Sequence, residues 1–305
     1  MKVLLIDVDS KIPNLALMKI SAYHKLHGDK VFLAYGCKPD KVYISCVYDW
    51  NKPQALGIGK MFSCSIEYGG YGINKKHLAK EIEHLKPDYS LYPNMDYSMG
   101  FTSRGCIRKC PFCLVWRNEG KIQNNAPIEE FWESTHKKVL LLDNNYLASP
   151  KWKENIHFLL EHQLEVSWCQ GLDIRLVNDD NAFWLAQVES RTMAFKGKRY
   201  YFAFDDPTIE QQLLDGMEVL ESHGIKAHQL SFFILCGFNT THAQDMHRVN
   251  VIKKLGSTPF VMKYNRRQDD LWLNHFARWV NKHVYRSCTF EDYDRGNSQQ
   301  IIAQH

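Results

Sequence analysis

Short apolar runs alternate with helical patterns along most of this chain, and this alternation constrains its fold more than any other feature. Before residue 95 the runs are Val3–Ile6, 31–35, Val42–Val47, Cys64–Tyr68 and Tyr89–Tyr92, with helical spacing from Pro13 to Gly28 and from Leu78 to Leu85. Strands that alternate with helices favour a parallel sheet covered by helices. We therefore predict an α/β fold that begins with a Rossmann-like parallel sheet domain over residues 1–94.

The same alternation continues through residues 95–286. Six strand-like runs, Met95–Thr102, Val139–Leu142, Val166–Cys169, Tyr200–Phe204, Phe232–Cys236 and Pro259–Lys263, are each followed by a helical pattern, the last over Leu271–Val284. This order predicts a partial (βα)6 barrel, whose site would lie in the loops at the carboxyl ends of the strands. The polar stretch 287–305 is predicted to be a loose tail.

Three cysteines are packed into one short segment. Cys106, Cys110 and Cys113 form a C-x-x-x-C-x-x-C array, with Phe112 directly before the last of them. Closely spaced thiolates select zinc or an iron–sulfur cluster. A structural zinc ion takes four ligands, and no fourth Cys or His lies within the loop or close after it. The array therefore favours a cluster with one iron left open, although His77, His84 or His136 would complete a zinc site if the fold brought one in.

The array and its surroundings, TSRGC, CPFC and EG within Phe101–Gly120, resemble the radical S-adenosylmethionine (SAM) superfamily. The resemblance implies a [4Fe–4S] cluster on the three cysteines, with SAM chelated by the open iron. It also implies an enzyme that cleaves SAM reductively to a 5′-deoxyadenosyl radical, supplied with electrons by a flavodoxin- or ferredoxin-type donor. The alternative is a non-catalytic iron–sulfur or zinc protein with a structural or sensing role.

Polar residues follow the predicted barrel strands. Asp143, Asn144 and Asn145 follow the second run, Gln170, Asp173 and Arg175 the third, and Gly237 the fifth. Loops of this kind often cap the next helix, which is also our interpretation of Asp206. Capping does not explain Gln170, Asp173 and Arg175, which precede Leu176 and Val177 rather than a clear helix start. By its resemblance to the superfamily, this set, together with Phe112, is expected to bind SAM.

The N-terminal domain resembles the cobalamin-binding module of related radical SAM enzymes, and Gly69 and Gly70 match its glycine pair. The module's D-x-H-x-x-G loop should follow the first strand, but the chain has DVDSKIPN there, without the histidine and the glycine. We therefore predict that cobalamin is not required. Asp7, Asp9, Ser10 and the 69–72 turn are interpreted as turn residues at the strand ends.

Composition excludes few functions. The chain is 45% hydrophobic and 24% charged, with a net charge of +4 that is too small to indicate a long nucleic-acid footprint. The six cysteines outside the array are scattered (Cys37, Cys46, Cys64, Cys169, Cys236 and Cys288), as in reduced cytoplasmic proteins. No apolar run has the length of a membrane span, so we expect no membrane association.

Basic residues gather at two places in the sequence. Arg104, Arg108, Lys109 and Arg117 surround the array, and Lys263, Arg266 and Arg267 follow the sixth run. Neutralising a cluster and the SAM carboxylate accounts for part of this charge. If the remainder serves the substrate, that substrate is an anionic small molecule or a short RNA loop. The substrate and the net reaction stay open.

Overall fold

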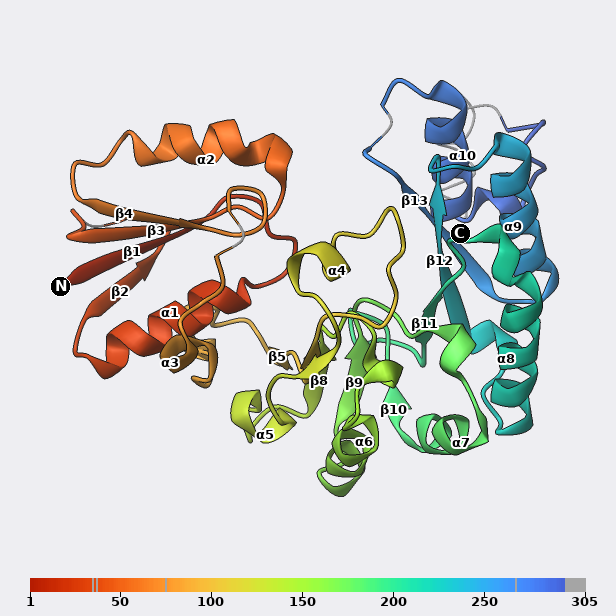
Figure 1. Cartoon of the computed structure of the whole chain (residues 1–305), viewed down its shortest axis with the longest axis horizontal. Coiled ribbons are helices and arrows are strands. Elements are labelled where there is room, and N and C mark those ends of the chain that lie inside the picture. Colours follow the sequence, from red (N-terminus) through yellow and green to blue (C-terminus); the bar gives the residue numbers. More distant parts are fainter. Residues whose placement is uncertain (35, 37, 75, 267, 294–305) are drawn as a thin grey trace. The chain divides into compact units, whose positions relative to one another are not determined.

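The computed structural model describes residues 1–34, 36, 38–74, 76–266 and 268–293 (Figure 1). The predictions for Tyr35, Cys37, Arg267 and the tail from residue 294 lie outside the described residues. Two compact units divide the chain: Met1–Phe101 with Ala126–Val139, and Thr102–Asn125 with Leu140–His305. The predicted domain limits at 94 and 286 stay predictions.

The first unit is built on a four-stranded parallel sheet. Its strands are β1 (Lys2–Asp7), β2 (Lys30–Leu33), β3 (Lys41–Ser45) and β4 (Ser65–Gly69), in the order β2-β1-β3-β4. Every neighbouring pair is parallel, with Val3 opposite both Val31 and Lys41. Both faces of β1 are buried, Leu4 and Ile6 in one apolar cluster and Val3 and Leu5 in another. Burial on both faces explains why β1 is an unbroken apolar run in the sequence.

Helices cover both faces of this sheet. Helices α1 (Leu15–Leu26) and α2 (Lys52–Gly59) lie on opposite sides of it in Figure 1. Leu17 and Ile20 of α1 join the cluster of Val3 and Leu5, and Ala55 of α2 joins the other cluster. The remaining elements of the unit are α3 (Lys80–Glu83), β5 (Ser98–Gly100) and α5 (Ile128–Phe131).

The second unit contains two groups of strands. Strands β8 (Lys138–Leu141, which the unit boundary crosses), β9 (Glu165–Trp168) and β10 (Glu189–Ser190) are neighbours in the order β10-β9-β8. Strands β11 (Tyr200–Ala203), β12 (Leu230–Cys236) and β13 (Thr258–Lys263) form a parallel sheet in sequence order. A parallel bridge from Leu172 to Phe202 links the loop after β9 to β11. The predicted α/β fold with parallel sheets is confirmed.

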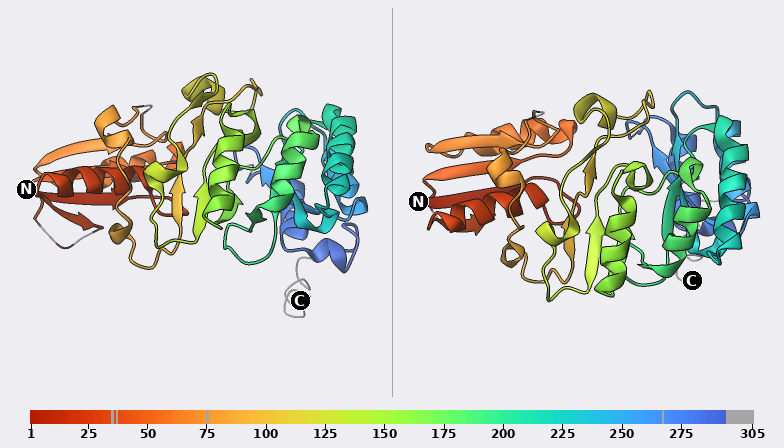
Figure 2. Two further views of the ribbon diagram at one scale, coloured as in Figure 1. Left: turned by 90° about the horizontal axis from the view of Figure 1, so that it is seen from below. Right: turned by 60° about the horizontal axis from the view of Figure 1, so that its bottom comes forward.

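Helices alternate with these strands, as the sequence predicted. They are α6 (Trp152–Glu161), α7 (Asp179–Gln187), α8 (Glu210–Ser222), α9 (His242–Lys254) and α10 (Leu271–Asn281). Helix α9 packs against β12 and β13, and α10 packs against β13. Figures 1 and 2 show α8, in teal, and α9, in blue, on the same side of the strands. Within the described residues no sheet closes on itself as a barrel.

Two local predictions were wrong, and one helix was missed. Tyr89–Tyr92 is not a strand but a short 3-10 turn, because the Asp88 side chain accepts a hydrogen bond from Ser90 N and caps the turn. The helix expected around Leu78–Leu85 shrinks to the single turn of α3. Helix α2 was not predicted, since glycines interrupt its pattern.

In the part of the chain that the structure describes, no helix is both long and apolar enough to cross a bilayer.

Candidate functional site

The three cysteines lie in the loop of a short hairpin in the second unit. Strands β6 (Ser103–Arg104) and β7 (Gln123–Asn124) pair antiparallel, and helix α4 (Val115–Asn118) lies within the loop between them. The turn into the loop depends on Gly105, which has φ +80°. A Cβ atom on Gly105 would lie 2.4 Å from the carbonyl oxygen of Lys121, so a side chain there would push the strands apart. The main chain of Cys106 donates to Gly120 O at 3.2 Å and closes the loop.

Two of the three sulfur atoms accept main-chain hydrogen bonds inside this loop. Arg108 N donates to Cys106 Sγ at 3.3 Å, and Val115 N donates to Cys113 Sγ at 3.4 Å. Cys106 Sγ also lies 3.5 Å from the amide nitrogen of Asn145. Hydrogen bonds of this kind favour the thiolate over the thiol and tune the potential of a bound cluster. The loop therefore offers the donors that thiolate ligands need.

The same surroundings act on the thiol pKa values. Burial is the largest effect on Cys110 and Cys113 and raises the pKa of both thiols, and a negative charge on Cys106 or Asp205 raises it further. The Arg175 charge acts in the opposite direction on the Cys110 pKa. The structure thus brings the cysteine loop, Arg175 and Asp205 into one electrostatic environment. A metal that binds these thiols displaces their protons.

Among the described residues, no group of three or more His, Cys, Asp or Glu side chains is arranged to hold a metal ion. Without a metal, nothing draws three neutral thiols together. What supports a cluster is the chemistry of the loop, which has three cysteines, two of whose sulfur atoms accept main-chain N–H groups. By this criterion the residues fit a [4Fe–4S] cluster with Cys106, Cys110 and Cys113 as ligands.

Asp143 and Asn144 fix the base of the cysteine hairpin. Asp143 is buried, and its carboxylate accepts from the main chain and the hydroxyl of both Thr102 and Ser103 at 2.6–3.1 Å. Burial is the main cause that raises the Asp143 pKa. Asn144 Nδ2 donates to Glu119 Oε2 at 2.8 Å, and the same oxygen accepts from Gly105 N. Both residues hold the hairpin in place after β8, and their expected contact with SAM stays a prediction.

Asn145 and Asp173 connect the ends of β8 and β9 to the loop. Asp173 accepts from Arg108 Nε at 2.9 Å and from Arg175 Nε at 2.6 Å, and Asn145 Nδ2 lies 3.4 Å from Asp173 Oδ2. Burial alone would raise the Asp173 pKa, but the bonds from the two arginines outweigh it and hold the pKa below its usual value. The amide oxygen of Asn145 is buried without a hydrogen-bond partner among the described residues. Such an atom needs a donor that a bound ligand can supply.

One argument from the sequence about this segment was wrong. Asp173 does cap a helical turn, the 3-10 turn Ile174–Leu176, by accepting from Arg175 N at 3.2 Å. Gln170 is exposed, and its amide nitrogen lies 3.9 Å from the sulfur of its neighbour Cys169. By contrast, the interpretation of Asp206 as a cap is confirmed, because its side chain accepts from Thr208 N.

Phe112 lies in a chain of aromatic rings at the ends of β12 and β13. Its ring is 5.6 Å from that of Phe238 in an edge-to-face arrangement, and the Phe238 ring is 4.8 Å from that of Tyr264. Gly237, directly before Phe238, has φ +82°. These contacts place two of the predicted residues, Phe112 and Gly237, at the same end of the sheet.

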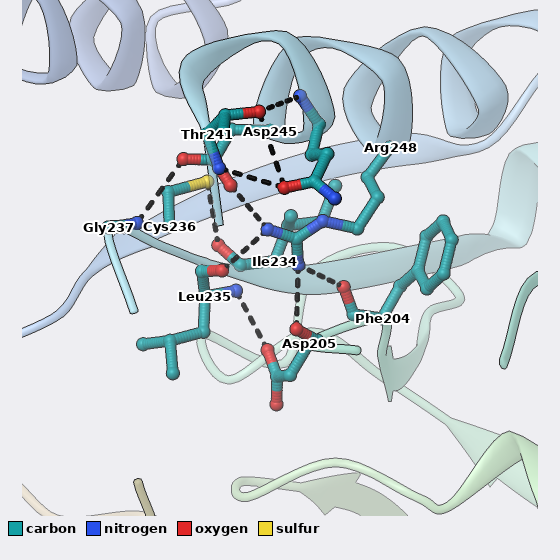
Figure 3. Close-up of polar contacts among 10 residues, drawn as sticks. Phe204, Asp205, Ile234, Leu235, Cys236, Gly237, Thr241, Asp245 and Arg248 are labelled. Carbon is teal, nitrogen blue, oxygen red and sulfur yellow. Dashed lines mark hydrogen bonds and ion pairs between the residues drawn. The ribbon is translucent and has the colours of Figure 1, made fainter. Parts of the chain in front are cut away.

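Sequence reasoning missed a buried ion pair between Asp245 and Arg248 on α9 (Figure 3). Both side chains are fully buried, and Arg248 Nη2 lies 2.5 Å from Asp245 Oδ1. Arg248 also donates to the carbonyl oxygens of Phe204, Asp205 and Leu235 at 2.8–2.9 Å. Gly237 N donates to Asp245 Oδ2 at 3.2 Å. The pair therefore clamps the carboxyl ends of β11 and β12, where the predicted site lies.

Much of the basic charge near the site is engaged within the protein. Arg104 pairs with Glu119 at 3.4 Å, Arg108 pairs with Asp173, and Arg117 donates to Pro111 O. Lys263 donates to Asn274 on α10, the helix that covers β13. The Lys263 side chain is therefore directed toward the helix layer.

The carboxyl edge of the first unit's sheet is closed by its own loops. Asp9 accepts from Val47 N at 2.7 Å, from Tyr48 N at 3.0 Å and from Asn51 Nδ2 at 3.0 Å. Burial alone would raise the Asp9 pKa, but these bonds outweigh it and lower the pKa. A Cβ atom on Gly70, which has φ +89°, would lie 2.2 Å from Cys46 O. Gly70 thus serves a contact between two loops, and this edge does not fit a cobalamin of the kind that the resemblance implies.

We expect no stoichiometric binding of cobalamin by the full chain, because hydrogen bonds and packing within the protein occupy the sheet edge. The measurement is a visible absorbance spectrum of the protein after incubation with hydroxocobalamin and gel filtration. Co-elution of about one cobalamin per chain, at the one-site stoichiometry of a tight complex, would contradict the expectation and point to methyl transfer.

No protein-family model matches the chain, and no curated protein matches it. The functional argument therefore rests on the chemistry of the site.

Proposed function

We propose that this chain is a radical SAM enzyme in which residues 95–286 form a partial (βα)6 barrel. The observation that carries the proposal is the cysteine loop, in which three thiols lie between Cys106 and Cys113 and the sulfur atoms of these two residues accept main-chain hydrogen bonds. When bound, a [4Fe–4S] cluster with SAM on its open iron supplies an electron for reductive cleavage of SAM to a 5′-deoxyadenosyl radical. Cys106, Cys110 and Cys113 are its ligands.

The protein's own residues position the groups around this loop. Asp143 and Glu119 hold the hairpin to the end of β8. Asn145 would offer its unpartnered amide oxygen as an acceptor for the N–H groups of the SAM amino group. Asp173 fixes the guanidinium of Arg175 beside the loop, where a positive charge attracts a carboxylate. Phe112, resting on Phe238, offers an aromatic surface to adenine.

The first unit, in this proposal, is a Rossmann-like domain without cobalamin. The reductant is a flavodoxin- or ferredoxin-type protein in the cytoplasm, and the substrate is an unidentified molecule that carries an anionic group. The alternative of a non-catalytic iron–sulfur or zinc protein makes a different prediction, because such a protein has no reason to consume SAM.

Reduced, cluster-loaded protein is expected to convert SAM into 5′-deoxyadenosine and methionine slowly, even without substrate. The measurement is anaerobic incubation with dithionite, followed by liquid chromatography and mass spectrometry. Asn145→Ala is expected to weaken SAM binding at least tenfold while iron content is unchanged, because the buried amide oxygen is lost. Asn250→Ala, exposed on α9, is the control. Absence of both products despite an intact cluster would favour the non-catalytic alternative.

A further inference from the structure

One face of the β11–β13 sheet is apolar and open. Side chains alternate between the two faces of a strand. Tyr200, Phe202, Phe232, Ile234 and Val261 are buried. The alternate residues point to the opposite face, and two of them, Phe260 and Met262, are 42% and 47% exposed. We call this surface the aromatic face; its residues are Tyr201, Ala203, Phe233, Leu235, Phe260 and Met262.

The strand register brings three aromatic rings together on this face. Phe233 pairs with Ala203 on β11 and with Phe260 on β13. The rings of Tyr201 and Phe233 are stacked, 5.4 Å apart with an angle of 3° between their planes. Phe260 meets Phe233 edge to face at 5.9 Å. Neighbouring strands are about 4.8 Å apart, so the three strands present a face about 10 Å wide, which matches a fused two-ring heterocycle.

Asp205 stands at the carboxyl end of the aromatic face. It continues the alternation of Tyr201 and Ala203, and its Oδ1 accepts from Leu235 N at 2.8 Å. Figure 3 shows its carboxylate directed away from Arg248, which lies on the helix side of the sheet. Burial raises the pKa of Asp205 to about 6, despite the Leu235 hydrogen bond and the charges of Arg248 and Arg175. The hydrogen bond and the two charges do not offset the cost of burying this carboxylate. Further N–H donors from a ligand would therefore stabilise it.

The surroundings of Asp205 connect this face to the cysteine loop. The Asp205 charge acts on both Cys110 and Cys113. The loop after β9 also lies beside the aromatic face. A Cβ atom on Gly171, in this loop, would lie 3.5 Å from the Phe233 ring. A ligand on the aromatic face therefore lies in the same unit and at the same strand ends as the proposed reaction centre.

We propose that the aromatic face binds the substrate through a flat heteroaromatic ring with neighbouring N–H donors, as in a guanine-type base, and that Asp205 accepts from those donors. Stacking supplies the affinity of the ring, and the carboxylate selects its hydrogen-bonding edge. This inference rests on the proposed function, because it names the substrate class of the same site. It is independent of the anionic group, which would lie elsewhere on the substrate.

The test measures binding to the full chain at pH 8, by calorimetry and without reductant or turnover. The probes are guanosine 5′-monophosphate, inosine 5′-monophosphate and ribose 5-phosphate, which share the phosphate and differ in the ring and its exocyclic amine. We expect guanosine monophosphate to bind at least tenfold more tightly than ribose 5-phosphate. Phe260→Ala is expected to weaken it at least fivefold, and Asp205→Asn to abolish its advantage over inosine monophosphate.

Matched controls separate the face from general effects. Phe183→Ala removes an aromatic ring of similar exposure, 50%, on α7, and Asp206→Asn changes the neighbouring acid, whose capping role Asn retains. Neither is expected to change binding. Equal affinity for all three probes, or unchanged binding in Phe260→Ala, would overturn the inference. So would a change of oligomeric state in Phe260→Ala, which would assign the face to a second copy of the chain.

Two further results keep this inference distinct from the proposed function. If Asp205→Asn weakens SAM while guanosine monophosphate binds as before, the carboxylate belongs to the SAM site and the inference is wrong. Conversely, binding of guanosine monophosphate by a protein that never takes up iron would overturn the proposed function and leave the aromatic face as a base-binding site.

Discussion

Replacing any one of Cys106, Cys110 and Cys113 by Ser is expected to abolish the cluster. In the proposed cluster each supplies one of three protein ligands, and a hydroxyl is a poor substitute for a thiolate on iron. Anaerobically reconstituted wild-type protein should be brown, with about four irons per chain. The variants should fall below about a tenth of that content and lose all cleavage of SAM, since the open iron is lost with its cluster.

Cys288→Ser is the matched control, because Cys288 is also a partly buried free thiol in the second unit. It should keep full iron content and full cleavage of SAM. The measurements are iron and zinc analysis by plasma mass spectrometry and the visible absorption spectrum. Stoichiometric zinc without iron in the wild-type protein would contradict the proposed function, as would a Cys110→Ser variant that keeps four irons.

Arg248→Met is expected to lower the free energy of unfolding of the second unit by about 3–5 kcal/mol. The change leaves the carboxylate of Asp245 buried without its counter-charge, and removing one partner of a buried pair typically costs this much. It also leaves the carbonyl oxygens of Phe204, Asp205 and Leu235 without their donor. The measurement is urea denaturation, with hydrogen exchange to locate the loss at β11 and β12.

The matched control is Lys151→Met, which breaks an exposed ion pair of the same i, i+3 spacing with Glu154. Exposed pairs contribute about 0–1 kcal/mol, so this variant should unfold almost as the wild type does. The double variant Asp245→Leu/Arg248→Met should lose less than Arg248→Met alone, because no buried charge is left unpaired. Equal stability of Arg248→Met and Lys151→Met would show that the clamp does not hold the strand ends.

Strands were predictable from the sequence where burial decides the structure. The run Val3–Ile6 is apolar because both faces of β1 are buried, and it forms a strand. The run Phe232–Cys236 also forms a strand, with Phe232 and Ile234 buried on the helix side. Prediction failed where a single polar contact decides. Because Asp88 caps it, Tyr89–Leu91 forms a 3-10 turn and not a strand. Asp173 caps a second 3-10 turn, Ile174–Leu176, which has no helical pattern in the sequence.

The site was predictable only in part, for a related reason. A cysteine array is recognisable because closely spaced thiols indicate a metal or cluster site whatever the fold. The Asp245–Arg248 pair has the spacing of an ordinary surface pair on a helix, and only the packing of α9 on β12 buries it. The aromatic face depends on the register of three strands. That register is set by contacts far apart in the chain, which one sequence does not reveal.

Asp9 has a further consequence for the first unit. Its carboxylate satisfies the N–H groups of Val47 and Tyr48, which an anion would otherwise bind at the end of β3. It acts as a ligand tethered to its own receptor, and tethering by a short segment corresponds to an effective concentration in the millimolar range. A free anion must exceed that concentration to displace it. These two N–H groups are therefore occupied by the chain itself for as long as Asp9 stays in place.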